Sequence, residues 1–264
     1  MVEEKIRLGG MALANGVLVH GPAAWACAVR TPQGRIDTAS GYKRFPAALV
    51  QQPLLRGPAR LLEVVTLLPR VRRALPAARL PFERPVVIVT MVVSALAAQA
   101  VKRSSLRPFA RELVGSLLSL APTALAVRGS EVAGYHGAEH ISIGSYEHGE
   151  RREKEHERCG SHMVGPLLLS SAVGGAMAAH APKKLQPAAK ATAQLGALAA
   201  STEIFAWMVR NPEHKLSRAL ARPGHELQHR LATEEPTPEQ LEVAEAALRA
   251  CLELEQQREG SRAN

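Results

Sequence analysis

This 264-residue sequence has few aromatic residues, few cysteines and only one long apolar run that is free of charge. With 3% aromatic residues it has little to stack on bases, which argues against a nucleic-acid binder. Its three cysteines, Cys27, Cys159 and Cys251, are too few and too far apart for a disulfide framework, so they suit a reducing compartment. Residues 1–5 lack the basic start and apolar stretch of a secretory signal, so we expect none.

Positive charge is in excess, with a formal net charge of +9 and an isoelectric point of about 9.9. Such a balance suits an anionic partner, either nucleic acid or a membrane surface. The arginines are spread along the chain and form no single dense tract. Together with the shortage of aromatic residues, this pattern predicts no nucleic acid and leaves membrane lipid open as an anionic partner.

Four apolar stretches occupy the middle of the chain: residues 86–101, 113–127, 163–182 and 191–209. A membrane-spanning helix needs about 20 mostly apolar residues, and only the third stretch reaches that length without a charge. Basic residues stand at several ends, as at Lys102-Arg103 and Lys183-Lys184. Hydropathy alone fits both a membrane bundle and a buried helical bundle in a soluble protein.

The two ends of the chain have clearer local signals. Residues 9–45 are rich in strand-forming segments, and the turn Thr31-Pro32-Gln33-Gly34 predicts a β-hairpin. Thr237 and Gln240 predict a capping box that opens a helix ending near Gln257. We therefore divide the chain into a β-rich region (1–45), a helical core (46–215) and a C-terminal amphipathic region (216–264). The first part of the core, residues 46–84, has an amphipathic helical pattern.

His136, Glu139 and His140 form an H-x-x-E-H pattern. Residues four apart lie on one face of a helix, so the two imidazoles can chelate one ion of zinc or another divalent transition metal. The same pattern is the signature of the inverted zinc peptidases. Adjacent helical residues point about 100° apart, so Glu139 cannot easily bind the ion from the same direction as His140. We predict that Glu139 is a general base that accepts a proton from water on the metal.

Three further side chains that can bind zinc follow within twenty residues: Glu147, His156 and Cys159. If Glu147 or His156 is the third ligand, water keeps the fourth position, as a catalytic site requires. If His156 and Cys159 both bind, they close a four-ligand structural site with the two motif histidines. A nucleophilic Cys159 beside His156 is a third option, but residues so placed in an apparent metal cluster more often share an ion.

The chain is similar to the YqhQ-like family of uncharacterised bacterial membrane proteins. The motifs that carry the resemblance are Gly9-Gly10, Asn15-Gly16-Val17, Gly21-Pro22, Leu54-Leu55-Arg56-Gly57, Tyr135 to His140, Tyr146-Glu147, His156-x-Arg158-Cys159-Gly160, Pro223-Gly224, Leu227-Gln228 and Glu242-Val243-Ala244. The chain departs from the family at Asn15, where the family has a glutamate, and at His20, where it has an arginine.

The resemblance implies a membrane protein described as a metal-dependent enzyme. With it, we expect a mainly α-helical bundle embedded in the cell membrane, with cytoplasm-facing regions and a small N-terminal β-hairpin region. We expect a zinc-dependent hydrolase, peptidase-like in its motif. The alternative is a non-enzymatic membrane or scaffold protein with a structural zinc site.

Overall fold

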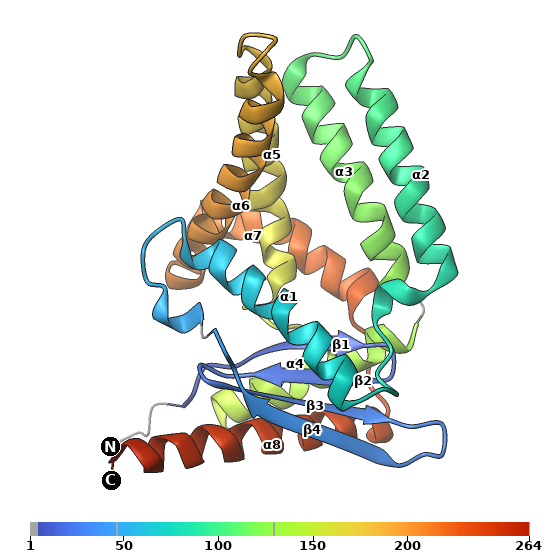
Figure 1. Ribbon diagram of the computed structural model, residues 1–264, viewed down its shortest axis with the longest axis vertical. Coiled ribbons are helices and arrows are strands. Elements are labelled where there is room, and N and C mark those ends of the chain that lie inside the picture. The colour runs from blue at the N-terminus through green and yellow to red at the C-terminus, as the bar shows by residue number, and fades with distance from the viewer. Residues whose placement is uncertain (1–4, 46, 129, 264) are drawn as a thin grey trace.

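The computed structural model describes residues 5–45, 47–128 and 130–263. Figure 1 shows a lower tier, made of a β-sheet with α1, α4 and α8, and an upper tier of two helical hairpins, α2–α3 and α5–α6. The helices are α1 (Arg56–Ala74), α2 (Pro85–Lys102), α3 (Pro108–Val127), α4 (Glu131–His148), α5 (Val164–Ala179), α6 (Gln186–Arg210), α7 (Lys215–Leu227) and α8 (Pro238–Ala263). The expectation of a mainly helical fold with an N-terminal β region is confirmed.

The β region is a four-stranded antiparallel sheet in the order β1-β2-β3-β4, and therefore larger than a single hairpin. Its strands are β1 (Gly9–Leu13), β2 (Gly16–His20), β3 (Ala24–Arg30) and β4 (Ile36–Tyr42). The predicted hairpin is β3–β4. Its turn is closed by the amide of Gly34, which donates to the Thr31 carbonyl over 2.9 Å, and Gly34 has the positive φ of 81° that glycine tolerates best.

Helices cover both faces of the sheet, and the two-residue period of the strands decides which side chain meets which helix. Val17 and Val19 pack with α4 and α8, whereas Leu18 between them packs with Leu67 and Val71 of α1. Because both faces are covered, β2 is a continuous apolar run with no polar alternation. The first core cluster contains residues of all three predicted segments, while the boundaries of those segments stay a prediction.

The C-terminal helix begins as predicted. The Gln240 amide donates to the Thr237 hydroxyl at 3.3 Å, and the Thr237 amide donates to the Gln240 side chain at 3.0 Å, which forms the capping box. The helix continues past the predicted end at Gln257 to Ala263. Its buried stripe includes Cys251, as expected for a cysteine that belongs to the core.

Two residues of the N-terminal motif have structural roles. Asn15 donates to the Ala77 carbonyl over 2.9 Å and accepts from the Arg79 amide, so it ties the β1–β2 turn to the chain after α1. The His20 imidazole lies 3.1 Å from the Nζ of Lys43, which is ion-paired at 2.5 Å to the buried Glu63 of α1. Burial and, to a lesser extent, the neighbouring Lys43 lower the pKa of His20 to about 3, so the neutral ring can accept from Lys43.

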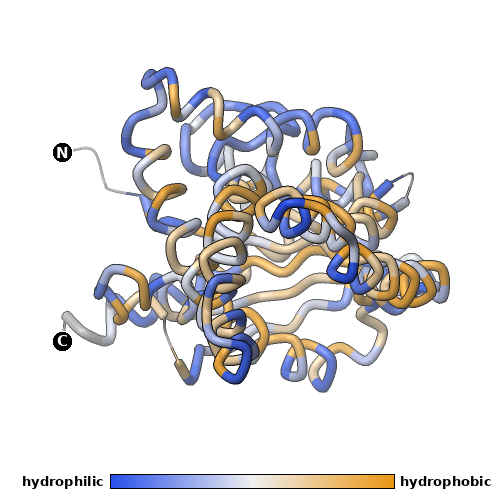
Figure 2. The backbone as a smooth tube through the Cα atoms, turned by 90° about the horizontal axis from the view of Figure 1, so that it is seen from above, coloured by the Kyte–Doolittle hydropathy of each residue, from blue (hydrophilic) through white to orange (hydrophobic). Residues whose placement is uncertain are grey.

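The upper tier leaves its apolar side chains uncovered. Pro85–Lys102, Pro108–Val127 and Gly160–Ala179 are long and apolar enough to cross a membrane, and only 11%, 11% and 33% of their residues are buried. Seven large side chains on α2 are 47–62% exposed: Val86, Ile88, Val89, Met91, Val92, Val93 and Leu96. In Figure 2, which looks from above, orange hydrophobic residues are concentrated on the coils at the right and centre of the view, while coils along its top are mostly blue. Apolar surface this continuous indicates membrane association.

Candidate metal centre

The H-x-x-E-H residues lie on α4, the most deeply buried helix of the lower tier. Small residues on this helix let other segments approach its backbone. A Cβ on Gly137 would lie 2.2 Å from the carbonyl oxygen of Glu234, and one on Gly134 would lie 2.4 Å from the Gln240 side chain. The segment before α8 therefore passes directly over α4 and brings backbone carbonyls to the motif.

Backbone carbonyls fix both motif imidazoles. His136 Nδ1 lies 2.8 Å from the Ala232 oxygen, and His140 Nδ1 lies 2.6 Å from the Lys154 oxygen. A carbonyl can only accept, so each Nδ1 carries the proton and each Nε2 keeps a free lone pair. Burial lowers the pKa of His140 far below its usual value, with a further contribution from His136, so this ring is neutral. The rings lie 4.3 Å apart between centroids, as expected for neighbours one helical turn apart.

Cys159 completes a group of three. One ligand atom from each of His136, His140 and Cys159 lies within 4.8 Å of the others. The Cys159 sulfur lies 3.6 Å from His136 Nε2. Zinc–sulfur and zinc–nitrogen bonds at a tetrahedral angle place these two atoms about 3.6 Å apart. Burial raises the pKa of Cys159, so the thiol holds its proton until a metal displaces it.

Glu139 lies beside the group and faces the sheet. It is buried, and its Oε2 atom has no hydrogen-bond partner within the described residues. Burial raises the pKa of Glu139 to about 7, while His136 lowers it and Cys159 raises it. A Cβ on Gly10 of β1 would lie 2.4 Å from Glu139 Oε1, so the missing side chain at Gly10 makes the room that this carboxyl occupies.

The structure places Glu147 and His156 together but outside the group of three. His156 Nε2 lies 3.2 Å from Glu147 Oε2, and Arg158 is ion-paired to the same carboxylate. Desolvation raises the pKa of Glu147, but His156 and Arg158 lower it more, and the net pKa lies below its usual value. The His156 ring still lies next to His140, with centroids 5.5 Å apart. Glu147 and His156 therefore form a polar pair next to the three ligand candidates.

Gln228 fixes the loop that carries His156 and Cys159. It is fully buried, accepts from the His156 amide over 2.9 Å, and donates to the Ser161 hydroxyl over 2.7 Å. Sequence reasoning assigned it no role. Its only signal was its place in the Leu227-Gln228 motif, because a buried glutamine cannot be told from a surface one by spacing.

The alternative of a nucleophilic Cys159 activated by His156 has little geometric support. His156 Nε2 is directed to Glu147, and its Nδ1 accepts from the Arg158 amide over 3.3 Å. The raised pKa of Cys159 is also the opposite of what a reactive thiolate needs.

Fold and site together define a mainly helical, membrane-associated protein with a partly buried His-His-Cys cluster that could hold a metal ion. The chain belongs to the family described as "Protein of unknown function (DUF1385)", which matches residues 86–254 and so includes the cluster and both hairpins. Neither the curated proteins nor the solved structures contain a match to this chain.

Proposed function

We propose that this protein is a membrane-associated, zinc-dependent hydrolase whose metal ligands are His136, His140 and Cys159. The observation that carries the proposal is the pairing of three convergent donor atoms with an unpartnered, buried carboxyl at Glu139. A buried polar atom without a partner costs roughly 1–3 kcal/mol, so it calls for a role. A site with three protein ligands leaves a fourth position for water or substrate, as catalytic zinc sites do.

The ligands, Glu139 and two backbone carbonyls have separate roles in the proposed site. Zinc held by the three ligands would supply a Lewis acid and lower the pKa of water at the open position. Glu139 would accept a proton from water at this site and could pass it to the leaving group. The carbonyls of Ala232 and Lys154 hold the two imidazoles in the tautomer that keeps Nε2 free.

We further propose that the upper tier lies in the cell membrane and that the lower tier, with the metal centre, faces the cytoplasm. Basic residues are concentrated at the end of α1 and in its connection to α2, where Figure 1 shows the lower tier meeting the α2–α3 hairpin: Arg70, Arg72, Arg73, Arg79 and Arg84. All three cysteines are free, as a reducing compartment favours.

Metal content tests the ligand set. Elemental analysis of the protein purified in neutral detergent should find one zinc per chain. His136→Ala, His140→Ala and Cys159→Ala should each lose it, while the control His148→Ala, at an exposed histidine outside the group, should keep it. Equal metal in all five proteins would refute the ligand set.

Glu139→Gln separates catalysis from binding. This variant should keep its zinc but lose about 10²–10⁴-fold in the rate of whatever hydrolysis a panel of peptide, ester and phosphoester substrates reveals. Loss of zinc from Glu139→Gln would mean that Glu139 is a ligand instead.

A structural zinc site is the second candidate, and it rests on the His156 ring, 5.5 Å from that of His140. A rotated His156 would close the coordination sphere and leave no room for water. In that case His156→Ala should release the zinc and unfold the loop, and Glu139→Gln should be silent. In the hydrolase, His156→Ala keeps the zinc.

A further inference from the structure

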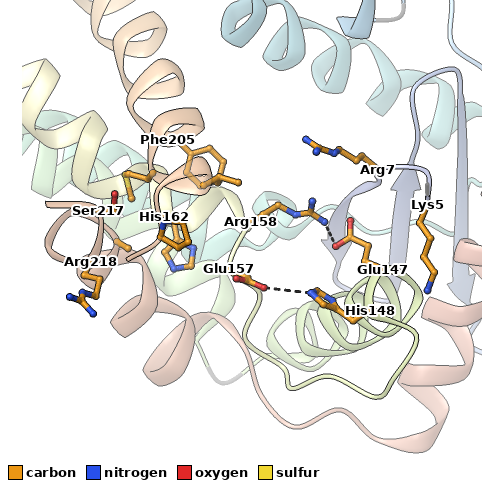
Figure 3. Close-up of a pocket in the computed structure, with 14 residues that line it drawn as sticks. Lys5, Arg7, Glu147, His148, Glu157, Arg158, His162, Phe205, Ser217 and Arg218 are labelled. Carbon is orange, nitrogen blue, oxygen red and sulfur yellow. Dashed lines mark ion pairs between the residues drawn. The ribbon is translucent and has the colours of Figure 1, made fainter. Parts of the chain in front are cut away.

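A cavity lies beside the metal centre, and none of the three proposed zinc ligands lines it. It has a volume of about 520 Å³, within the range of small-molecule sites. Figure 3 shows Arg7 and Arg158 on one side of it, and Ser217 and Phe205 on the other. The chain segments that meet there are the N-terminal segment, the end of α4, the loop that carries His156 and Cys159, the end of α6 and the start of α7.

The charge of this cavity selects an anion. Four basic residues line it against two acidic ones, and both acids have partners in the protein. Glu147 is held by Arg158 and His156, and Glu157 lies 3.7 Å from His148. The nearest acid to Arg218 is Glu213 at 3.6 Å, but both are exposed, so this ion pair is weak.

Ser217 supplies an unused donor. Its side chain is 3% exposed and lines the cavity, and its Oγ atom has no partner within the described residues. It lies in the first turn of α7, where backbone amides lack intrahelical acceptors and the helix dipole favours a negative charge. Gly224 fixes this helix, since a Cβ there would lie 2.4 Å from the Ser161 carbonyl.

The remaining wall is apolar. Phe205, Met208 and Val209 come from the last turns of α6, the helix that continues upward into the hairpin tier. A molecule with its anionic group at Ser217 and Arg218 can therefore lay an apolar chain along α6 toward the membrane.

We propose that this cavity binds the phosphate group of a lipid, with Ser217 and Arg218 at the phosphate, Arg7 and Arg158 adding positive charge from the opposite wall, and Phe205, Met208 and Val209 along the chain. Oxyanion recognition by arginine and a helix N-terminus accounts for the first set of residues. The proposal goes beyond the hydrolase and does not depend on zinc, because none of the three proposed ligands, His136, His140 and Cys159, lines the cavity.

Binding to the full-length protein in neutral detergent tests the proposal with three probes. These are a short-chain phosphatidic acid, the matching diacylglycerol without phosphate, and inorganic phosphate. The phosphatidic acid should bind saturably and at least about tenfold more tightly than either of the others. Equal binding of diacylglycerol would refute recognition of the phosphate, and equal binding of inorganic phosphate would refute the role of the apolar wall.

Matched variants locate the site. Ser217→Ala and Arg218→Gln should each weaken binding of the phosphatidic acid about tenfold, since hydrogen bonds to charged groups contribute about 1.5–3 kcal/mol. The controls are Ser201→Ala, a buried α6 serine outside the cavity, and Arg222→Gln, an exposed arginine one turn further along α7. Neither control should change binding, and an equal loss in the controls would overturn the assignment.

Two further measurements separate binding from structure and from the metal. Because Ser217 Oγ has no hydrogen-bond partner among the described residues, Ser217→Ala should leave the thermal stability of the lipid-free protein unchanged or slightly higher. A clear loss of stability would mean that Ser217 is structural. His140→Ala should keep lipid binding while losing zinc, so failure of the hydrolase and failure of the lipid site give different results.

Discussion

The lower and upper tiers use the same apolar residue types in opposite ways. Leu18 in β2 is fully buried, whereas Leu96 in α2 is 62% exposed. Val243 in α8 is fully buried, whereas Val92 in α2 is 56% exposed. A water-soluble protein rarely leaves a continuous apolar surface of this kind uncovered. The difference teaches that the two tiers are built for different solvents, the lower one for water and the upper one for lipid.

Truncation of a buried leucine should show the largest difference between the tiers. Leu18→Ala should lower the free energy of unfolding by about 2–5 kcal/mol, because it removes apolar contacts and leaves a cavity. Leu96→Ala removes the same atoms from a surface that detergent covers and should cost under about 1 kcal/mol. Thermal and denaturant unfolding in neutral detergent would measure both. Similar losses would contradict a lipid-facing α2.

An introduced charge should have the opposite pattern to the leucine truncations, with the larger effect in the upper tier. Val92→Arg places a charge in the middle of a candidate span, at a cost of about 2.5–3.5 kcal/mol on insertion scales. Ser40→Arg, on the exposed side of β4, should change stability by no more than about 0.5 kcal/mol. The measure is the fraction of protein that remains in the membrane pellet after a carbonate wash. A pellet fraction unchanged by Val92→Arg would place α2 outside the lipid.

Gly10 tests how the sheet supports the metal centre. Gly10→Ala would place a Cβ 2.4 Å from Glu139 Oε1, and overpacking of this kind costs about 1–3 kcal/mol. The three ligand candidates have other anchors, so zinc should stay while hydrolysis falls.

Gly41→Ala is the control for Gly10→Ala, since its nearest neighbour would be at an ordinary 3.4 Å. Unfolding temperature and zinc content of both variants would be compared. A stable, fully active Gly10→Ala protein would show that Glu139 can occupy another position.

The capping box should give the smallest effect. Thr237→Ala removes the acceptor for the Gln240 amide and should cost about 1 kcal/mol. Thr90→Ala in α2, where the hydroxyl donates only to the Val86 carbonyl of its own helix, should change stability by less than about 0.5 kcal/mol. The two unfolding free energies would be measured side by side, and a larger loss at Thr90 would invert the expected order.

Local features of the site could be predicted from the sequence, and those that need a loop to fold could not. His136 and His140 lie on the same side of α4 because one helical turn separates them, and that spacing is visible in the sequence. The choice among Glu147, His156 and Cys159 depends on partners outside the motif. Arg158 and Glu147 hold His156, while the fold of the loop around Gln228 brings Cys159 to His136.

The sequence by itself determined the turn at Gly34 and the capping box at Thr237, because each depends on interactions within a few residues, and it showed that His136 and His140 share one face if their segment is helical. Only the tertiary structure decided that β1 lies against Glu139, that both faces of the sheet are covered, and that a cationic cavity opens where α6 and α7 meet. These features join segments that are far apart in the sequence, such as Gly10 with Glu139 and Leu18 with Leu67. Their geometry follows from packing of the whole chain, which no local pattern encodes.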